Sequence, residues 1–600
     1  MDASGQPSGS LSRLSGALVV AHRHPVAVAT VLAAVLHVVW FFCFANSGGD
    51  LAAQDAWAEF VGRHPDTAYN LAWYGGMHPV SYSVISPYLM HVLGVRTTMM
   101  IAGTASAALL ALILTRCRGA VRRPLWPALA GVYGLFCNAL SGRVTFGLGV
   151  LFALGAVTAV FCLPRRWAGR RWAKGAVAAP LAALATAASP VAGLFLGVVA
   201  AALFLTRRRP AAYVLGLPPV AVVGLSAWLF PFSGTQPMKL GSAWLPFLFG
   251  LAVALLVPKA WRTVRVAAGV YALGVFLTWA IDSQVGSNVT RLVMLFGGAA
   301  LLAALPYTAA RSWRRRAVVL AVVGLSAWIT TNSVTDIVRT TPVAAWNREL
   351  APLVDQLRKA GADRGRVEVV PASSHRESSA FPAYVNLARG WNRQADLERN
   401  PIFYEATLSA DAYRAWLERW AVHYVVLPAD KPDSGGVTEA KLVRGGLPYL
   451  REVWGDENWR LFAVEDPTEL VSGPASVVRA GADRLVIDVR APGRVLVRIP
   501  HSPWLGLVDA AGKAVPPPQE TFASRARGPA AVPKDYANTS GCLFKAAPDA
   551  FGDVWTELLA PAPGEYRVAA KYQLPRGTPC PDELVNHTLG TPERPTPPRP

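Results

Sequence analysis

Carboxylates are scarce in the first 335 residues of this chain, and four of them stand close together in one short stretch. The acids of this part are Asp2, Asp50, Asp55, Glu59, Asp66 and Asp282, against 26 Lys and Arg residues. A carboxylate is costly to place beside lipid, yet long apolar runs flank the stretch 50–66. This grouping predicts an active site at a membrane surface, where carboxylates could accept protons or bind a cation.

Asp50 follows a Gly-Gly pair and precedes a helix-forming run. Its carboxylate would cap that helix by accepting from free backbone N–H groups, or act as a general base on an acceptor hydroxyl; the two roles are compatible. Asp55 is a second catalytic candidate. Asp55 and Glu59 are four residues apart and share a helix face, so they would either bind a divalent metal such as Mg²⁺ or Mn²⁺ or remain solvated.

Two arginines are candidates for binding a phosphate. Arg291 stands near the outer end of an expected membrane span, where topology does not account for it. It would pair with Asp282 or bind a phosphate, for which the guanidinium group is well suited. Arg143 is a similar arginine at another outer loop, and Asn288 lies close to Arg291 in the sequence. The two arginines are the candidates for binding the donor phosphate, and Asn288 is a candidate for the substrate groove.

Aromatic residues and a histidine follow the acidic stretch. Trp73 and Tyr74 precede a Gly-Gly turn, and His78 follows it. Aromatic faces at a membrane boundary would stack on sugars or prenyl chains, or they would serve as interface anchors. His78 would act as a proton shuttle or have no catalytic task. Trp73, Tyr74 and His78, together with Asn288, are therefore the candidates for a substrate groove.

The elements that must position these residues are membrane spans. Apolar runs of the length needed to cross the hydrocarbon core occur at 26–45, 97–115, 124–140, 143–163, 175–189, 191–206, 211–230, 243–258, 264–281, 290–310 and 317–335. Basic clusters follow every second run, which places them in the cytoplasm together with the N-terminus. From residue 336 onward, 32 basic residues balance 32 acidic ones, so the net charge of +20 reflects membrane topology and not nucleic-acid binding.

The chain therefore divides into five parts. Residues 1–25 form a cytoplasmic tail, and residues 26–337 form a polytopic α-helical domain of about eleven transmembrane helices with a long first external loop at 46–96. Residues 338–470 are a mixed α/β segment, residues 471–585 a β-sandwich, and residues 586–600 a disordered tail; the α/β and β parts are extracytoplasmic. Cys542 and Cys580 lie in the exported part, as a disulfide or as two buried thiols.

Together these features resemble the GT-C superfamily, the multi-span glycosyltransferases that use polyprenyl-phosphate sugars. The segments that carry the resemblance are 47–50 (SGGD), 73–79 (WYGGMHP) with Tyr82 and 86–88 (SPY), 189–194 (SPVAGL) and 288–292 (NVTRL). The resemblance implies a GT-C-like fold in the plasma membrane, a catalytic Asp at position 50, and transfer from a polyprenyl-phosphate sugar to an envelope glycan, lipid or protein. The loop has no Asp-x-Asp motif, so no metal cofactor is certain.

Two other functional classes stay open. The first is a multi-pass transporter of the major-facilitator kind. The odd number of expected spans, the lack of acids inside them and the large exported part speak against it. The second is a non-catalytic scaffold of the cell envelope. The chain has no P-loop, no Gly-x-Ser-x-Gly and no His-Glu-x-x-His motif, so a transferase outside the cell would need a donor that is already activated.

Overall fold

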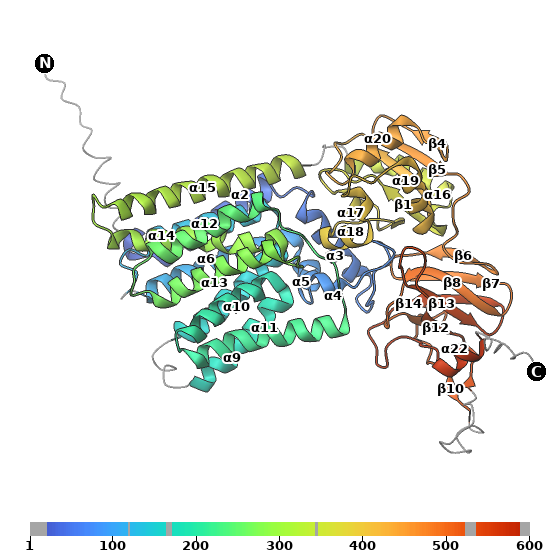
Figure 1. The fold of residues 1–600 in the computed structure, drawn as a ribbon, viewed down its shortest axis with the longest axis horizontal. Coiled ribbons are helices and arrows are strands. Elements are labelled where there is room, and N and C mark those ends of the chain that lie inside the picture. Colours follow the sequence, from blue (N-terminus) through green and yellow to red (C-terminus); the bar gives the residue numbers. More distant parts are fainter. Residues whose placement is uncertain (1–20, 118–119, 164–170, 342–345, 522–535, 589–600) are drawn as a thin grey trace, which may run out of the picture.

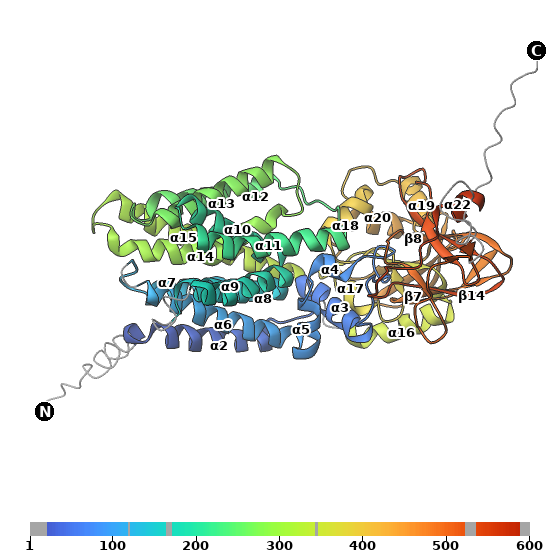
Figure 2. The ribbon, with the colours of Figure 1, turned by 90° about the horizontal axis from the view of Figure 1, so that it is seen from below.

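The computed structural model describes residues 21–117, 120–163, 171–341, 346–521 and 536–588. Most of the predicted cytoplasmic tail and of the predicted C-terminal tail lies outside these residues. The molecule is elongated: a bundle of helices occupies one end, two strand-containing domains occupy the other, and the first external loop lies between them (Figure 1). A view turned by 90° shows the same order along the long axis (Figure 2).

Apolar helices build the bundle. They are α2 (Pro25–Cys43), α6 (Val95–Arg116), α7 (Leu125–Leu140), α8 (Val144–Phe161), α9 (Arg171–Ala188), α10 (Pro190–Leu205), α11 (Arg209–Leu229), α12 (Leu240–Leu256), α13 (Arg262–Ala280), α14 (Arg291–Ala304) and α15 (Trp313–Thr340). In the described part of the chain, seven segments are long and apolar enough to cross a membrane, and α7, α9, α10 and α12 are shorter apolar helices. The chain is therefore a multi-pass membrane protein; the number of eleven spans stays a prediction.

Two boundaries in the bundle matter for the site. The chain turns between α9 and α10 at Ser189, which has an extended backbone, and α10 begins at Pro190, as predicted. Helix α15 continues to Thr340, beyond the expected end of the last span at 335. Its last turns therefore carry Asp336, which lies just beyond the expected end of that span.

The first external loop folds into three short helices, α3 (Asp50–Arg63), α4 (Pro79–Tyr82) and α5 (Ser86–Leu93). The chain between α3 and α4 makes a tight turn in which Asn70 and Met77 form two backbone hydrogen bonds, of 2.8 and 2.9 Å. Trp73 and Tyr74 lie inside this turn and are almost completely buried. The loop is thus a packed element that joins the bundle to the domains beyond it.

The α/β domain contains a five-stranded sheet of order β2-β1-β3-β5-β4. Its strands are β1 (Arg366–Val369), β2 (Asn386–Leu387), β3 (Val422–Pro428), β4 (Leu450–Gly455) and β5 (Trp459–Val464). Its helices are α16 (Trp346–Lys359), α17 (Glu377–Ala380), α18 (Arg393–Arg399), α19 (Ala410–Arg419) and α20 (Val437–Gly445). The first three strands are parallel and the others antiparallel, so the sheet is mixed.

The β-rich domain packs two antiparallel sheets face to face. One has the order β6-β7-β14-β9 and the other β12-β13-β8. The strands are β6 (Ala475–Ala480), β7 (Arg484–Val489), β8 (Gly493–Pro500), β9 (Gly506–Val508), β12 (Cys542–Lys545), β13 (Trp555–Ala560) and β14 (Gly564–Ala569); β10 (Gln519–Glu520), β11 (Tyr536–Ala537) and α22 (Asp582–Thr588) lie beside them. Cys542 and Cys580 form a disulfide.

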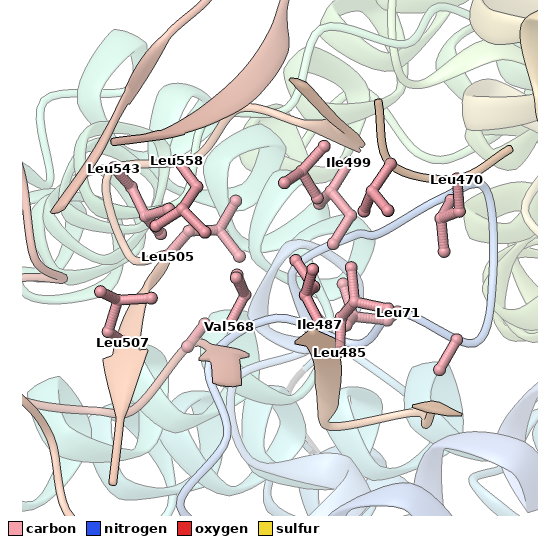
Figure 3. Packing of buried hydrophobic residues seen from close by; sticks show 14 of the residues in the cluster. Leu71, Leu470, Leu485, Ile487, Ile499, Leu505, Leu507, Leu543, Leu558 and Val568 are labelled. Carbon is pink, nitrogen blue, oxygen red and sulfur yellow. The ribbon is translucent and has the colours of Figure 1, made fainter. Parts of the chain in front are cut away.

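The core of this domain includes a residue from the first external loop. Leu485, Ile487 and Val568 come from one sheet, and Leu543 and Leu558 from the other (Figure 3). Leu71 packs into the same cluster, so the domain core and the loop form one buried surface (Figure 3). Burial of apolar surface on this scale stabilises the docking by about 25 cal/mol for each Å² removed from water.

Candidate active site

A cavity of about 830 Å³ lies where the ends of the helices meet the α/β domain. Three kinds of wall enclose it. The charged wall has Asp50, Arg143 and Arg291; the apolar wall is formed by α10 and α11; and the third wall is residues 391–394 of the α/β domain. A pocket that combines a carboxylate, two guanidinium groups and an apolar flank suits a charged headgroup attached to a hydrocarbon.

Asp50 is the first residue of α3, and its neighbour Gly49 occupies the N-cap position without any side-chain capping bond. Asp50 is therefore not the N-cap residue and lies instead in the first turn of the helix. The Asp50 carboxylate faces Arg143, with 3.8 Å between Oδ2 and Nε, and about a third of the side chain is exposed. This leaves the carboxylate accessible from the cavity.

The backbone before Asp50 is held by parts of the chain that are far apart in sequence. Gly49 has φ of +61°, and its N–H donates to the carbonyl of Ser374 at 2.6 Å. A Cβ at Gly49 would lie 2.7 Å from Cγ2 of Thr340, at the end of α15. Only glycine fits this position, because it tolerates the left-handed backbone and the close contact. The α/β domain and the last span together therefore set where Asp50 stands.

Arg143 connects two carboxylates. It precedes α8, and its guanidinium lies 3.8 Å from Asp50 and 3.2 Å from Oδ2 of Asp336. The same Asp336 oxygen accepts a hydrogen bond of 2.7 Å from the hydroxyl of Ser141. Asp336 was not identified from the sequence as a residue of the site. The apolar periodicity of α15, had it been followed one turn further, would have placed Asp336 on that helix.

Arg291 is the first residue of α14, after the 3-10 turn η2 (Gly286–Thr290). Its guanidinium carbon lies 5.2 Å from the ring centroid of Phe146, a cation–π contact. The Arg291 side chain has no hydrogen bond or ion pair with any residue that the structure describes, so the alternative of a pair with Asp282 is wrong. It interacts electrostatically with Asp50 and Arg143 across the cavity. Arg291 is thus a cation without a paired anion at the wall of the cavity.

The predicted groove residues Trp73 and Tyr74 lie outside the cavity lining, because the turn that contains them is packed against the α/β domain. The indole N–H of Trp73 donates to the carbonyl of Ser378 at 3.0 Å. The Tyr74 hydroxyl donates to the carbonyl of Asn392 at 3.2 Å and accepts from its N–H at 3.0 Å. Tyr74 therefore contributes to the site by holding the backbone of Asn392, which lines the cavity.

The wall formed by residues 391–394 is held to the first external loop from a second direction. Asn392 caps α18, accepting from the N–H of Ala395 at 3.1 Å. Near the other end of α18, Arg399 donates to the carbonyls of Tyr74 and Gly76, both at 2.7 Å. Both ends of α18 thus contact the same turn, and this fixes the distance between the wall and the bundle.

His78 is also placed away from the cavity. It lies between the first external loop and the β-rich domain, where Nδ1–H donates to the carbonyl of Ala68 at 2.8 Å. Its Nε2 accepts from the hydroxyl of Ser502 at 3.1 Å. Burial lowers the pKa of His78 to about 4, so the imidazole is neutral. These contacts give His78 a structural role at the interface of the two domains.

Asn288 lines the cavity, and its amide nitrogen lies 3.5 Å from Oε1 of Gln236. Tyr82, from α4, is an aromatic residue of the lining that the sequence analysis named only as part of the resemblance. Its ring stacks on Trp57, with 5.6 Å between centroids. Burial, and then the Asp50 carboxylate, raise the pKa of Tyr82, so it stays a phenol and a hydrogen-bond donor.

The two carboxylates predicted to share a metal have separate partners. Asp55 pairs with Arg96, and Glu59 pairs with Arg63 at 2.5 Å. Neither residue lines the cavity. No group of three or more His, Cys, Asp or Glu side chains suited to a metal occurs among the residues that the structure describes. The structure therefore does not bring Asp55 or Glu59 to Asp50, because one turn of α3 directs Asp55 toward α6.

The apolar wall is open beside the helices. Gly197 of α10 and Gly224 of α11 have no neighbouring atom within 4 Å of the position that a Cβ would take. Val220 and Val223, on the same side of α11, line the cavity and are exposed. The missing side chains at these two glycines leave open space in the apolar wall of the cavity.

Comparisons with known proteins find a family match for part of the chain and a similar solved structure. A family model described as a domain of unknown function (DUF8823) matches residues 472–586, which contain the β-rich domain. No curated protein matches the chain. Among solved structures, it is similar to the arabinofuranosyltransferase AftD from Mycobacteria, determined by cryo-EM, with 16% identity and a TM-score of 0.40. That similarity covers 78% of this chain and 41% of AftD, so the chain spans less than half of that protein's length.

Proposed function

We propose that the protein is a glycosyltransferase that transfers a sugar from a polyprenyl-phosphate donor to an envelope glycan, lipid or protein at the outer face of the plasma membrane. The observation that carries the proposal is the cavity itself. It places a carboxylate, an unpaired guanidinium group and an apolar wall around one space of about 830 Å³. The sequence resemblance to the GT-C superfamily supports the same function.

Each wall has a role in this reaction. The acceptor hydroxyl attacks the anomeric carbon, and Asp50 takes its proton. The bond between the anomeric carbon and the phosphate oxygen breaks, and the prenyl phosphate leaves with the bonding electrons. Arg291 binds the phosphate and stabilises its growing negative charge. A cation that is already in position needs no reorganisation during the reaction, and its effect is stronger where water is partly excluded. Arg143, held by Asp336, orients the Asp50 carboxylate. Attack from the face opposite the leaving phosphate inverts the anomeric configuration.

The site favours transfer over transport. The cavity lies at the ends of the helices, and residues 391–394 of the α/β domain cover it. A carrier that alternates between two sides is expected to bind near the middle of its bundle, between two helical halves. Within the described helices of the bundle, the one acid is Asp336, and it lies in the last two turns of α15. In this arrangement the N-terminus is cytoplasmic and the two C-terminal domains are outside.

The test is transfer by the full chain in proteoliposomes, with radiolabelled polyprenyl-phosphate sugars as donors and delipidated cell envelopes as acceptors. We expect Asp50→Asn to lower kcat by about 10² to 10⁴, the usual contribution of a general base. The matched control is Asp282→Asn, an external acid outside the cavity lining, which should retain full transfer. Full activity of Asp50→Asn would refute the assignment, and so would loss of the same size in the control.

A further inference from the structure

The most exposed large apolar side chain in the described part of the chain is Leu574, with 86% of its surface accessible. It stands at the tip of the loop Tyr572–Gly577, which follows β14 in the β-rich domain, and Pro575 beside it is also exposed. A leucine side chain exposed to water at a loop tip does not contribute to the stability of the fold. Such a residue indicates a contact with an apolar partner.

The loop lies next to a helix that faces lipid. The guanidinium carbon of Arg576 is 5.9 Å from the ring centroid of Trp228 and 5.7 Å from that of Trp504. Trp228 is the second-last residue of α11 and is 70% exposed. The indole N–H of Trp504 donates to the carbonyl of Leu229, the last residue of α11, at 2.9 Å. The loop is therefore attached to the end of α11.

The other side of the loop contacts the first external loop. Lys571, just before it, pairs with Asp66 at 2.6 Å, and the N–H of Tyr572 donates to the carbonyl of Asp66 at 2.9 Å. Tyr572 also interacts with Tyr88 of α5. The loop is thus fixed between α5 and α11, so Leu574 cannot turn away from the bundle without breaking these contacts.

The neighbouring surface identifies the partner. Helix α11 is long and apolar enough to span a membrane, and it exposes Leu217, Val220 and Leu225 along its length. Trp228, at its end, is the residue type that concentrates at the level of lipid headgroups. Leu574 and Arg576 continue this surface: an apolar side chain for the acyl region and a guanidinium group for a phosphate headgroup.

We propose that the loop Tyr572–Gly577 is a membrane-contacting loop, which inserts Leu574 and Pro575 into the leaflet beside α11 and binds lipid phosphate through Arg576. The partner is the bilayer surface, not a protein. This assigns a task to part of the region matched by the DUF8823 model: it holds the β-rich domain against the membrane. The proposal does not depend on the transfer reaction.

The test measures the depth of single labelled positions in the full chain. Leu574→Cys is made in a background that lacks the four free cysteines, labelled with an NBD fluorophore, and reconstituted into vesicles of phosphatidylcholine and phosphatidylglycerol that contain doxyl-labelled lipid. The matched control is Phe551→Cys, an apolar residue of the same domain that is 58% exposed and lies beside Arg419 of the α/β domain. The disulfide Cys542–Cys580 is retained in both.

We expect doxyl lipid to quench NBD at position 574 at least about threefold more than at position 551, and aqueous iodide to show the reverse order. Equal quenching by doxyl lipid at the two positions would refute the proposal. Arg576→Ala should reduce the lipid quenching at position 574, more strongly in vesicles with phosphatidylglycerol. An unchanged value there would refute the role of Arg576. Because Leu574 is exposed, its substitution does not disturb the domain core.

Discussion

Replacing Arg291 with Gln should weaken binding of the donor while it leaves the stability of the fold almost unchanged. Arg291 lines the cavity, has no ion pair among the described residues, and contacts the ring of Phe146. A hydrogen bond to a charged group contributes about 1.5–3 kcal/mol. Loss of this contact to the donor phosphate should therefore lower kcat/KM by about 10- to 150-fold. The loss should be largest for donors that carry an ionised phosphate.

The stability of the same variant should change little. Arg291→Gln removes a cation–π contact of about 0.5–1 kcal/mol. It also removes the repulsion between Arg291 and Arg143, which acts in the opposite direction. Arg143→Gln is the matched control, because it removes the cation that now lies 3.8 Å from Asp50 and 3.2 Å from Asp336. Since these carboxylates are about a third exposed, we expect a destabilisation of only about 1 kcal/mol.

The assay pairs thermal unfolding in detergent with initial rates of transfer in proteoliposomes. The expected pattern is a stable but slow Arg291→Gln, and a less stable Arg143→Gln. An Arg291→Gln variant that unfolds at clearly lower temperature while it transfers sugar at the normal rate would refute the reasoning. That result would make Arg291 a structural residue of the bundle. Arg291→Lys, which keeps the charge but not the guanidinium geometry, should recover part of the rate.

Three further predictions concern the elements that position the site. Gly49→Ala should destabilise the fold by about 1–2 kcal/mol through backbone strain, and further through the steric contact of its Cβ with Thr340. In a double-mutant cycle of unfolding free energies, Thr340→Ala should relieve the steric contribution and leave the backbone strain. Tyr74→Phe should cost about 1–3 kcal/mol, because it leaves the backbone N–H of Asn392 without its acceptor, and should speed hydrogen exchange at that N–H; wild-type exchange would contradict this. His78 is neutral when folded, so stability should fall as the pH drops from 6.5 to about 4, by about 3 kcal/mol; His78→Gln should show a smaller fall, and an equal one would be inconsistent with this role.

Much of the local structure follows from the sequence. The apolar runs predicted helices that the structure contains, and the turn at Pro190 was expected from its position in a long apolar stretch. The β-rich part was expected from about residue 471, and its strands begin at Ala475, because alternation and β-branched residues act over short distances. Asp50 and Arg291 were also identified from sequence, since a charge in an apolar context is conspicuous without any structure.

The partners of these residues depended on tertiary structure. Arg143 and Asp336 are 193 positions apart, and Tyr74 and Asn392 are 318 apart. No local pattern relates such residues; their contacts follow from how helices, turn and sheet pack together. The same packing moved Trp73, Tyr74 and His78 from a predicted groove into buried domain contacts. The sequence by itself therefore determined which segments enter the membrane and which charges are unusual there. Packing alone decided which of those charges share a cavity, because a side chain's neighbours are set by the whole fold and not by its own segment.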